Sequence, residues 1–356
     1  MANLDDLPIR QDLKGLQPYG APQLDVPVAL NVNENTYGIP EPVALSIVEN
    51  LASVVMDLNR YPDREFLGLR EALAGYLGHE LISEQVWAAN GSNEILQQFF
   101  MAFGGPGRKA LSFGPTYSMY PIIARSTLTE YLEEARNPDF SVSKESVIKA
   151  IADHNPDLVI LCGPNNPTGT PLELEVIEAA CERSTGMVLV DEAYAEFSDR
   201  ESAVTLLNRF PRLVISRTMS KAFAFAGARL GYMAADSAVV DAMRIVRLPY
   251  HLSALTQAAA KAALEHSALM LENVEKIKEQ RDRICSAVSE WGLVAYETDA
   301  NFVLVGGFTN PEEVFERLLT KGVLVRNVSI PGTLRITAGT EAETTKLLAE
   351  LALVLD

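Results

Sequence analysis

Short, continuous runs of apolar residues recur through the middle of the chain and alternate with longer stretches of helical periodicity. A strand that is apolar at every position is typical of a parallel sheet that is covered on both faces. Runs of this kind occupy residues 157–162, 187–190 and 213–215. Apolar residues recur at helical spacing over residues 42–57, 66–77 and about 172–184. This alternation predicts an α/β domain with a mostly parallel sheet flanked by helices.

The two ends of the chain have a different pattern from the middle. Residues 1–40 are rich in proline and show little periodicity, which indicates an extended arm. Residues 253–290 have helical spacing throughout and are long enough to bridge two domains. We therefore expect three parts. They are an arm at 1–40 that belongs to a small domain, a large domain at 41–250, and an interdomain helix followed by the small α+β domain at 251–356.

Composition and charge exclude several functional classes. With 356 residues, 48% of them apolar, the chain is long enough to form a large core. The formal net charge of −17 argues against a nucleic-acid or anionic-membrane surface. The three cysteines lie far apart and the four histidines form no ligand pair, so we expect neither disulfides nor a catalytic metal. The sequence shows no signal segment and no membrane-length apolar run, so we expect a cytoplasmic protein.

Polar side chains follow the predicted strands, where parallel sheets bind their ligands. Residues 86–96 read as a strand, a turn at Gly91 and a helix that Ser92 or Asn93 could cap. The start of such a helix can bind phosphate, although this pattern alone is common. Tyr117 follows the next strand. Its ring could stack on a flat ligand, and an aromatic side chain in the core or in a lid is an equally good interpretation.

Three further strand exits carry chemically distinctive groups. The loop at 163–170 holds two prolines and two glycines, so Asn166 is either aimed at a site or part of a plain surface loop. Asp191 ends a five-residue apolar run, and a carboxylate buried there requires a partner. Lys221 lies just past the strand at 213–215, and lysine forms Schiff bases with carbonyl cofactors. Arg335 interrupts an apolar run, either for a structural ion pair or for a bound anion.

Pyridoxal 5′-phosphate is the one cofactor that uses all of these groups together. Lys221 would hold it as a Schiff base, and Asp191 would stabilise its protonated ring nitrogen by opposite charge. Asn166 and Tyr194 would hydrogen-bond the oxygen on the ring. The predicted phosphate ligands are Ser92, Asn93, Ser220 and Arg229, with Tyr117 and Thr218 also counted among the cofactor-binding residues. We predict Lys221, Asp191 and Tyr194 as the catalytic residues.

Several motifs at matching spacings resemble the fold-type-I pyridoxal-phosphate aminotransferases, and within them the histidinol-phosphate aminotransferase family. The resemblance covers nearly the whole chain. It is carried by residues 31–35 (NVNEN), 60–62 (RYP), 91–94 (GSNE), 164–169 (PNNPTG), 191–194 (DEAY), 220–221 (SK) and Arg229. It implies an aspartate-aminotransferase-like large domain plus a smaller α+β domain. One departure concerns the arm, where residues 35–37 read Asn-Thr-Tyr and many relatives have Asn-Pro-Tyr.

The resemblance also implies a reaction and an assembly. The reaction is amino transfer between L-histidinol phosphate and 2-oxoglutarate, and the assembly is a homodimer in which Tyr61 reaches the partner's cofactor phosphate. Arg335 and Arg326 would bind the anionic end of the substrate. The implied substrate-binding residues are Tyr19, Asn33, Asn93, Tyr117, Tyr250, Arg326 and Arg335.

Three other functions share much of this pattern and stay open at this point. An aromatic amino-acid aminotransferase would use the same catalytic groups. A phosphothreonine-type decarboxylase would use the same cofactor and release carbon dioxide. A cofactor-sensing regulator on this fold would carry an added DNA-binding segment, which the acidic net charge disfavours.

Overall fold

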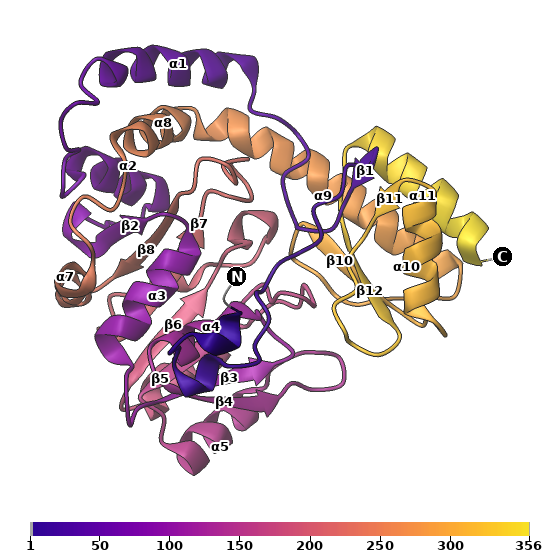
Figure 1. The fold of residues 1–356 in the computed structure, drawn as a ribbon, viewed down its shortest axis with the longest axis horizontal. Coiled ribbons are helices and arrows are strands. Elements are labelled where there is room, and N and C mark those ends of the chain that lie inside the picture. The colour runs from indigo at the N-terminus through magenta and orange to yellow at the C-terminus, as the bar shows by residue number, and fades with distance from the viewer. Residues whose placement is uncertain (1–2, 356) are drawn as a thin grey trace.

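The large domain is built on a mostly parallel sheet, as Figure 1 shows for the computed structural model, which describes residues 3–355. Within those residues its seven strands lie in the order β2-β8-β7-β6-β5-β3-β4. The five strands from β7 to β4 pair in parallel, whereas β8 is antiparallel to both β7 and β2. In sequence order the strands are β2 Val86–Ala89, β3 Lys109–Gly114, β4 Glu130–Ala135, β5 Leu158–Cys162, β6 Met187–Asp191, β7 Leu213–Thr218 and β8 Gly231–Ala235. The predicted α/β architecture is confirmed.

Helices cover both faces of this sheet. One hydrophobic cluster packs α5 and α6 against one face, and a second packs α3, α4, α7 and α8 against the other. The helices of the large domain are α1 Glu41–Val55, α2 Leu67–Leu77, α3 Ser92–Phe103, α4 Met119–Ser126, α5 Lys144–His154, α6 Leu174–Arg183, α7 Ser237–Val246 and α8 Ala254–Glu265. Burial on both faces is the physical reason why the central strands are apolar at every position.

Strand alternation decides which face carries the polar strand ends. In β6, Leu189 belongs to the cluster of α3 and α4, whereas Val188 and Val190 belong to the cluster of α5 and α6. Because side chains alternate along a strand, Asp191 points to the same face as Leu189. Cys162 at the end of β5 lies beside Asp191 in the register and also belongs to the α3 and α4 face.

The small domain lies beside the sheet and is joined to it by a long helix (Figure 1). Its three-stranded sheet has the order β12-β10-β9, and a parallel pair joins β1 from the arm to β11. Its strands are β1 Val28–Ala29, β9 Val294–Ala295, β10 Phe302–Gly306, β11 Val323–Leu324 and β12 Thr333–Thr337. Its helices are α9 Ser267–Glu290, α10 Pro311–Thr320 and α11 Glu341–Leu355.

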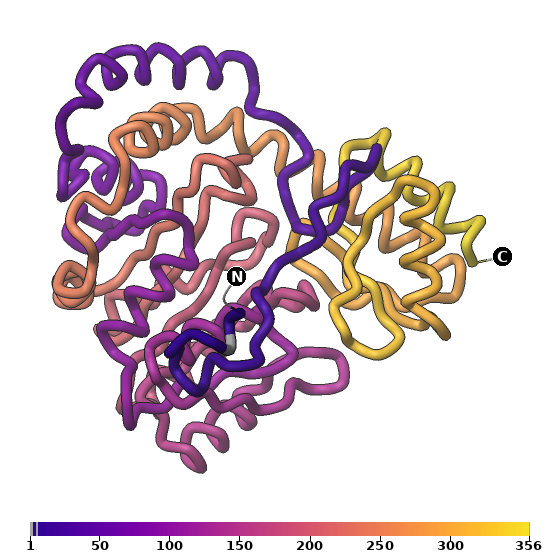
Figure 2. The backbone as a smooth tube through the Cα atoms, viewed as in Figure 1, coloured from indigo at the N-terminus to yellow at the C-terminus, as the bar shows by residue number. Residues whose placement is uncertain are grey.

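The N-terminal arm crosses from the large domain to the small domain before it reaches α1 (Figure 2). Arg10 donates hydrogen bonds to the backbone oxygens of Arg125 and Ser126 at the end of α4. Asn31 ties a later part of the arm to itself through a 2.9 Å bond to the backbone oxygen of Pro22. Short 3₁₀ segments occupy Leu4–Asp6, Gln11–Leu13, Ser83–Gln85, Ala195–Phe197 and Ala203–Leu206.

Three features differ from the expectations. The single helix expected over 253–290 is two helices, because the backbone leaves the helical region at His266, with φ −114° and ψ 26°. The first of them, α8, packs against α1 and α2, so residues 254–265 lie with the large domain and not with the small one. The residue that caps α3 is Gly91, with no side-chain bond from Ser92 or Asn93 to the helix start.

Candidate active site

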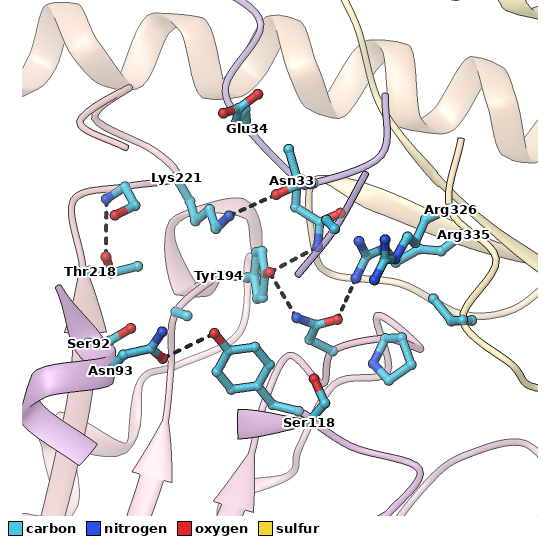
Figure 3. A pocket seen from close by; sticks show the side chains of 18 of the residues that line it. Asn33, Glu34, Ser92, Asn93, Ser118, Tyr194, Thr218, Lys221, Arg326 and Arg335 are labelled. Carbon is cyan, nitrogen blue, oxygen red and sulfur yellow. Dashed lines mark hydrogen bonds between the residues drawn. The ribbon is translucent and has the colours of Figure 1, made fainter. Parts of the chain in front are cut away.

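A cavity of about 520 Å³ lies where the carboxyl ends of β5, β6 and β7 face the small domain and the arm. Figure 3 shows side chains from all three regions pointing into it. The cavity brings together most of the predicted site residues. They are Tyr19, Asn33, Ser92, Asn93, Tyr117, Asn166, Asp191, Tyr194, Thr218, Ser220, Lys221, Arg229, Arg326 and Arg335.

Lys221 presents its amine to the middle of this cavity (Figure 3). Its Nζ donates a 3.2 Å bond to the backbone oxygen of Val32 in the arm and lies 5.9 Å from the centre of the Tyr194 ring. Burial and, to a smaller extent, the charges of Arg335 and Arg229 lower the pKa of the Lys221 amine to about 8, and Glu34 opposes the shift. A lysine in this state carries a large neutral fraction near pH 8 and is therefore nucleophilic.

Asp191 is a buried carboxylate, and one of its oxygens has no hydrogen-bond partner among the described residues. The hydroxyl of Tyr120 donates a 2.9 Å bond to Oδ2, whereas Oδ1 is buried without a partner among the described residues. Burial raises the pKa of Asp191 to about 6. Because an unpaired buried carboxylate oxygen is costly, the site is suited to a ligand that brings a proton or a positive charge to Oδ1.

Tyr194 and Asn166 form one hydrogen-bonded group at the side of the cavity. The Tyr194 hydroxyl accepts bonds from Nδ2 of Asn33 at 3.0 Å and from Nδ2 of Asn166 at 3.4 Å. Burial raises the pKa of Tyr194 to about 12, so the phenol keeps its proton at neutral pH. The loop at 163–170 therefore places Asn166 in the site, and it is not a plain surface loop.

The start of α3 lines the cavity and has the features of an anion-binding site. Its first amide groups have no acceptor within the helix, and they lie at the positive end of its dipole. Gly91 has φ +88°, and a Cβ there would lie 2.6 Å from Nη2 of Arg229, so glycine is required for the arginine to approach. A Cβ on Gly231 would lie 2.1 Å from the backbone nitrogen of Ser92.

Two arginines lie side by side at the small-domain wall of the cavity (Figure 3). Their backbones form an antiparallel bridge, with Arg335 N to Arg326 O at 2.8 Å. Arg335 also donates to Oδ1 of Asn166 at 2.7 Å and to the backbone oxygen of Asn31 at 2.8 Å. Burial lowers the pKa of Arg335 to about 10, and Arg326 contributes to the shift. The oxygens that accept from Arg335 carry no net charge, so they do not neutralise it. The two adjacent guanidinium charges are therefore available for an anionic ligand.

Two predicted residues lie outside the cavity lining of this chain. Tyr61 and Tyr250 stack on one another with ring centroids 4.5 Å apart, and both are exposed. Tyr61 is 81% exposed, so its side chain has few contacts within its own chain. The role of Tyr61 at the partner's phosphate and the role of Tyr250 in the substrate pocket therefore stay predictions.

Sequence reasoning missed two contributors to the site. Tyr120 lies in α4 and contacts Asp191, yet in the sequence it is one more aromatic residue near Tyr117. The backbone oxygen of Val32 accepts a bond from Lys221, and a backbone group has no sequence signal of its own. A search for a second aromatic hydroxyl group three residues after Tyr117, where α4 begins, would have identified Tyr120 as a candidate.

A buried ion cluster lies behind the site. Arg217 on β7 donates to Oε2 of Glu192 at 2.9 Å and to Oε1 of Glu196 at 3.1 Å. The same arginine donates to the Ser202 hydroxyl at 2.9 Å. The cluster thereby connects the strand that leads to Lys221 with the segment that follows Asp191.

The described part of the chain shows neither a metal cluster nor a membrane-crossing helix. No group of three or more histidine, cysteine, aspartate or glutamate side chains is arranged there to hold a metal ion. None of its helices has the length and hydrophobicity needed to cross a bilayer.

Comparisons with known proteins agree on the type of protein. The family described as "Aminotransferase class I and II" matches residues 26–351. A "Histidinol-phosphate aminotransferase" of Paenarthrobacter aurescens is 56% identical, over 100% of this chain and 97% of the relative. A protein of the same name from Thermobifida fusca is 51% identical, over 96% of this chain and 94% of the relative.

Solved structures give the same result for the fold. The structure of histidinol-phosphate aminotransferase from Sinorhizobium meliloti in complex with pyridoxal 5′-phosphate is similar with a TM-score of 0.84 and 25% identity. The similarity covers 93% of this chain and 91% of that one. An aspartate aminotransferase from Thermus thermophilus with maleate is similar with a TM-score of 0.78 and 26% identity, over 92% of this chain and 91% of that one.

Proposed function

Because this chain belongs to the class I and II aminotransferases, we infer that it is a histidinol-phosphate aminotransferase that uses pyridoxal 5′-phosphate. It transfers the amino group between L-histidinol phosphate and 2-oxoglutarate. The observation that carries this conclusion is the placement of the Lys221 amine and the unpartnered Asp191 oxygen in one cavity. The sequence similarity extends over the full chain, so the same set of groups is expected throughout the site.

The cavity fits the cofactor group by group. Oδ1 of Asp191 is free for a protonated ring nitrogen, and the start of α3 with Arg229 is free for a phosphate. Asn166 and Tyr194 lie where they orient a ring by hydrogen bonds. When bound, pyridoxal 5′-phosphate supplies an electron-withdrawing ring that stabilises negative charge on the substrate Cα.

The protein supplies proton transfer and orientation. The neutral Lys221 amine takes the proton from the substrate Cα as a general base, for which a pKa of about 8 is well matched to neutral pH. Asp191 holds a proton at the ring nitrogen by charge attraction. Tyr194, with its raised pKa, remains a hydrogen-bond donor to the ring oxygen.

We propose that Arg326 and Arg335 bind the anionic end of both substrates. Two guanidinium groups side by side match a phosphate dianion in the first half-reaction and a carboxylate of 2-oxoglutarate in the second. Tyr19, 55% exposed in the arm, also lines the cavity and would cover the bound substrate.

We also propose a homodimer with a shared site. Large apolar side chains are exposed on α1, on the turn after it and at the end of α7, on the side of the large domain remote from the small domain (Figure 1). They include Met56 at 82%, Tyr61 at 81%, Ile245 at 84% and Leu248 at 75% exposure. Large exposed apolar side chains support an interaction surface on these elements. A second copy that covers them would bring Tyr61 toward the partner's phosphate cradle.

We further propose that the protein works in a reducing compartment such as the cytoplasm. The three cysteines are free thiols. Burial raises the pKa of Cys162 to about 11, so this thiol beside the site stays protonated and unreactive.

Steady-state kinetics with three amino donors tests the function. We expect L-histidinol phosphate to give a kcat/KM at least about 100-fold above phenylalanine, because only the former meets both arginines with a dianion. Equal values would instead indicate an aromatic amino-acid aminotransferase. Release of carbon dioxide from phosphothreonine would indicate the decarboxylase.

A further inference from the structure

Tyr120 is the one hydroxyl that the described residues offer to the Asp191 carboxylate. Both side chains are buried, Tyr120 at 0% and Asp191 at 3% exposure, and the bond between them is 2.9 Å long. Tyr120 belongs to α4, whereas Asp191 ends β6, so two separate elements meet at this bond. The Tyr120 ring also packs edge-on against Tyr117, with centroids 5.5 Å apart. The Cys162 thiol is a second neighbour within hydrogen-bonding reach of the Tyr120 hydroxyl.

The two oxygens of the Asp191 carboxylate have different surroundings. Oδ2 accepts from Tyr120, and Oδ1 is buried without a protein partner. A carboxylate is planar, so a bond that fixes Oδ2 also fixes the direction in which Oδ1 points. Because Asp191 lines the cavity, Oδ1 is the oxygen left for a ligand.

The other groups around Asp191 do not replace this bond. The titratable and charged groups that face it are Tyr117 and Tyr120 from the α4 region, Cys162 from β5, and Glu192 and Tyr194 from the segment after β6. Glu192 is negative and raises the pKa of Asp191, whereas the Tyr120 bond and the Ala193 amide lower it. Within the described residues, Tyr120 is therefore the side chain that favours the charged form.

We propose that Tyr120 is a positioning residue for the reaction: it holds the Asp191 carboxylate with Oδ1 toward the ring nitrogen and keeps that carboxylate ionised. This inference rests on the proposed function, because it assigns Asp191 to the ring nitrogen. Tyr120 itself touches neither the substrate nor the cofactor in this assignment. It acts on the reaction only through Asp191.

Binding of pyridoxine 5′-phosphate to the full-length, cofactor-free chain tests the proposal. This compound has the ring and the phosphate but no aldehyde, so its affinity reports the Asp191 contact without covalent capture. The ionised Asp191 attracts a protonated ring nitrogen, whereas a protonated Asp191 carboxyl does not. The affinity therefore rises as the pH rises through the Asp191 pKa of about 6, and it falls again only where the ring nitrogen loses its own proton. The dissociation constant is measured by calorimetry between pH 5 and 9.

Three variants separate positioning from a merely structural role. Removal of the hydroxyl in Tyr120→Phe raises the Asp191 pKa further, so the midpoint of the rise in affinity should move up by about half to one pH unit. Tyr131→Phe removes a similar hydroxyl, 3.0 Å from Glu133 outside the cavity, and should leave the midpoint unchanged. In an Asp191→Asn background, Tyr120→Phe should cause no shift, because no titrating carboxyl remains.

The outcomes separate the positioning role of Tyr120 from the role of Asp191 at the ring nitrogen. A midpoint that moves in Tyr120→Phe but not in Tyr131→Phe supports the proposal. A uniform loss of affinity with the wild-type midpoint overturns it and leaves the proposed function intact. If wild type and Asp191→Asn show the same pH dependence, the role of Asp191 fails and the positioning role fails with it. Tyr120→Phe keeps the ring and its packing, and circular dichroism verifies that it folds.

Discussion

Nη1 of Arg335 donates a 2.7 Å hydrogen bond to Oδ1 of Asn166, a residue 169 positions away in the chain. The bond spans the cavity, from β12 of the small domain to the loop after β5 of the large domain. It also decides how the Asn166 amide is oriented, because the oxygen faces Arg335 and the nitrogen faces the Tyr194 hydroxyl. The arginine that we propose for substrate binding thus orients a residue that we propose for the cofactor.

This bond predicts that the two neighbouring arginines behave differently when changed to lysine. Arg335→Lys loses the paired donors and frees Asn166, so we expect kcat/KM to fall about 10- to 100-fold, with kcat and KM both affected. Arg326→Lys leaves Asn166 in place and should mainly raise KM. Steady-state kinetics with L-histidinol phosphate measures both. Equal changes in kcat for the two variants would contradict the orienting role of Arg335.

The lowered pKa of Lys221 predicts the pH at which the chain captures its cofactor. Only the neutral amine attacks an aldehyde, so the capture rate rises with pH and levels off above the amine's pKa. We expect a midpoint near pH 8, well below the ordinary lysine value of about 10.4. Glu34→Gln removes a charge that raises the pKa and should move the midpoint lower. Stopped-flow absorbance of the cofactor-free chain mixed with pyridoxal 5′-phosphate measures the rate.

The variant Asp191→Asn should have a lower turnover rate and a higher unfolding free energy than wild type. An amide cannot hold a proton at the ring nitrogen by charge, so we expect turnover to fall about 10²- to 10⁴-fold with the fold retained. In the cofactor-free chain the folded pKa of about 6 exceeds the ordinary aspartate value of about 3.9, so the ionised form costs stability above pH 6. That cost, up to about 3 kcal/mol, disappears as the pH falls through this window.

The measurement for this prediction is the difference in unfolding free energy between wild type and Asp191→Asn across pH. We expect the variant to be more stable at pH 8 and the two curves to converge below about pH 4. Asp139→Asn, at an exposed turn position, is the control and should neither slow turnover nor make the chain more stable at pH 8. A variant with near-normal turnover would remove Asp191 from its role at the ring.

Arg217 should be far more important for stability than an exposed arginine in an ion pair. Its removal in Arg217→Met leaves the buried Glu192 and Glu196 without their cation, which should cost about 3–5 kcal/mol. Arg209→Met breaks a solvent-exposed pair with Glu178 and should cost about 1 kcal/mol or less. Urea unfolding of both variants compares them. Similar midpoints would show that the buried cluster contributes little to stability.

Mixed dimers test the proposed sharing of the site. Lys221→Ala chains should be inactive, and Tyr61→Ala chains should be weakened in phosphate binding. If Tyr61 serves the partner's site, a mixed dimer has one site with both the wild-type lysine and the wild-type tyrosine. Refolding the Lys221→Ala and Tyr61→Ala chains together should then give more activity at low cofactor concentration than either variant has alone. Activity no higher than the sum of the separate variants would exclude this arrangement.

Much of the large domain could be predicted because its signals are local. The continuous apolar runs indicated the three central strands, and β5, β6 and β7 lie at those positions. Strand β4 was missed, because Glu130–Ala135 is rich in glutamate and partly exposed at the sheet edge. The break at His266 was missed because apolar residues keep their helical spacing on both sides of it.

The sequence by itself determined which chemical groups follow the strands and that these strands form a parallel sheet. Local patterns suffice for this, because the carboxyl ends of parallel strands meet at one edge and bring Asp191 and Lys221 together. The tertiary structure alone decided the partners of those groups: Tyr120 for Asp191, the Val32 oxygen for Lys221 and Arg335 for Asn166. These pairs join elements far apart in the chain. Sequence periodicity predicts single helices and strands, but it does not predict which of them come into contact. The pKa values follow from the same long-range packing, because burial and neighbouring charge are set only when the domains and the arm close around the cavity.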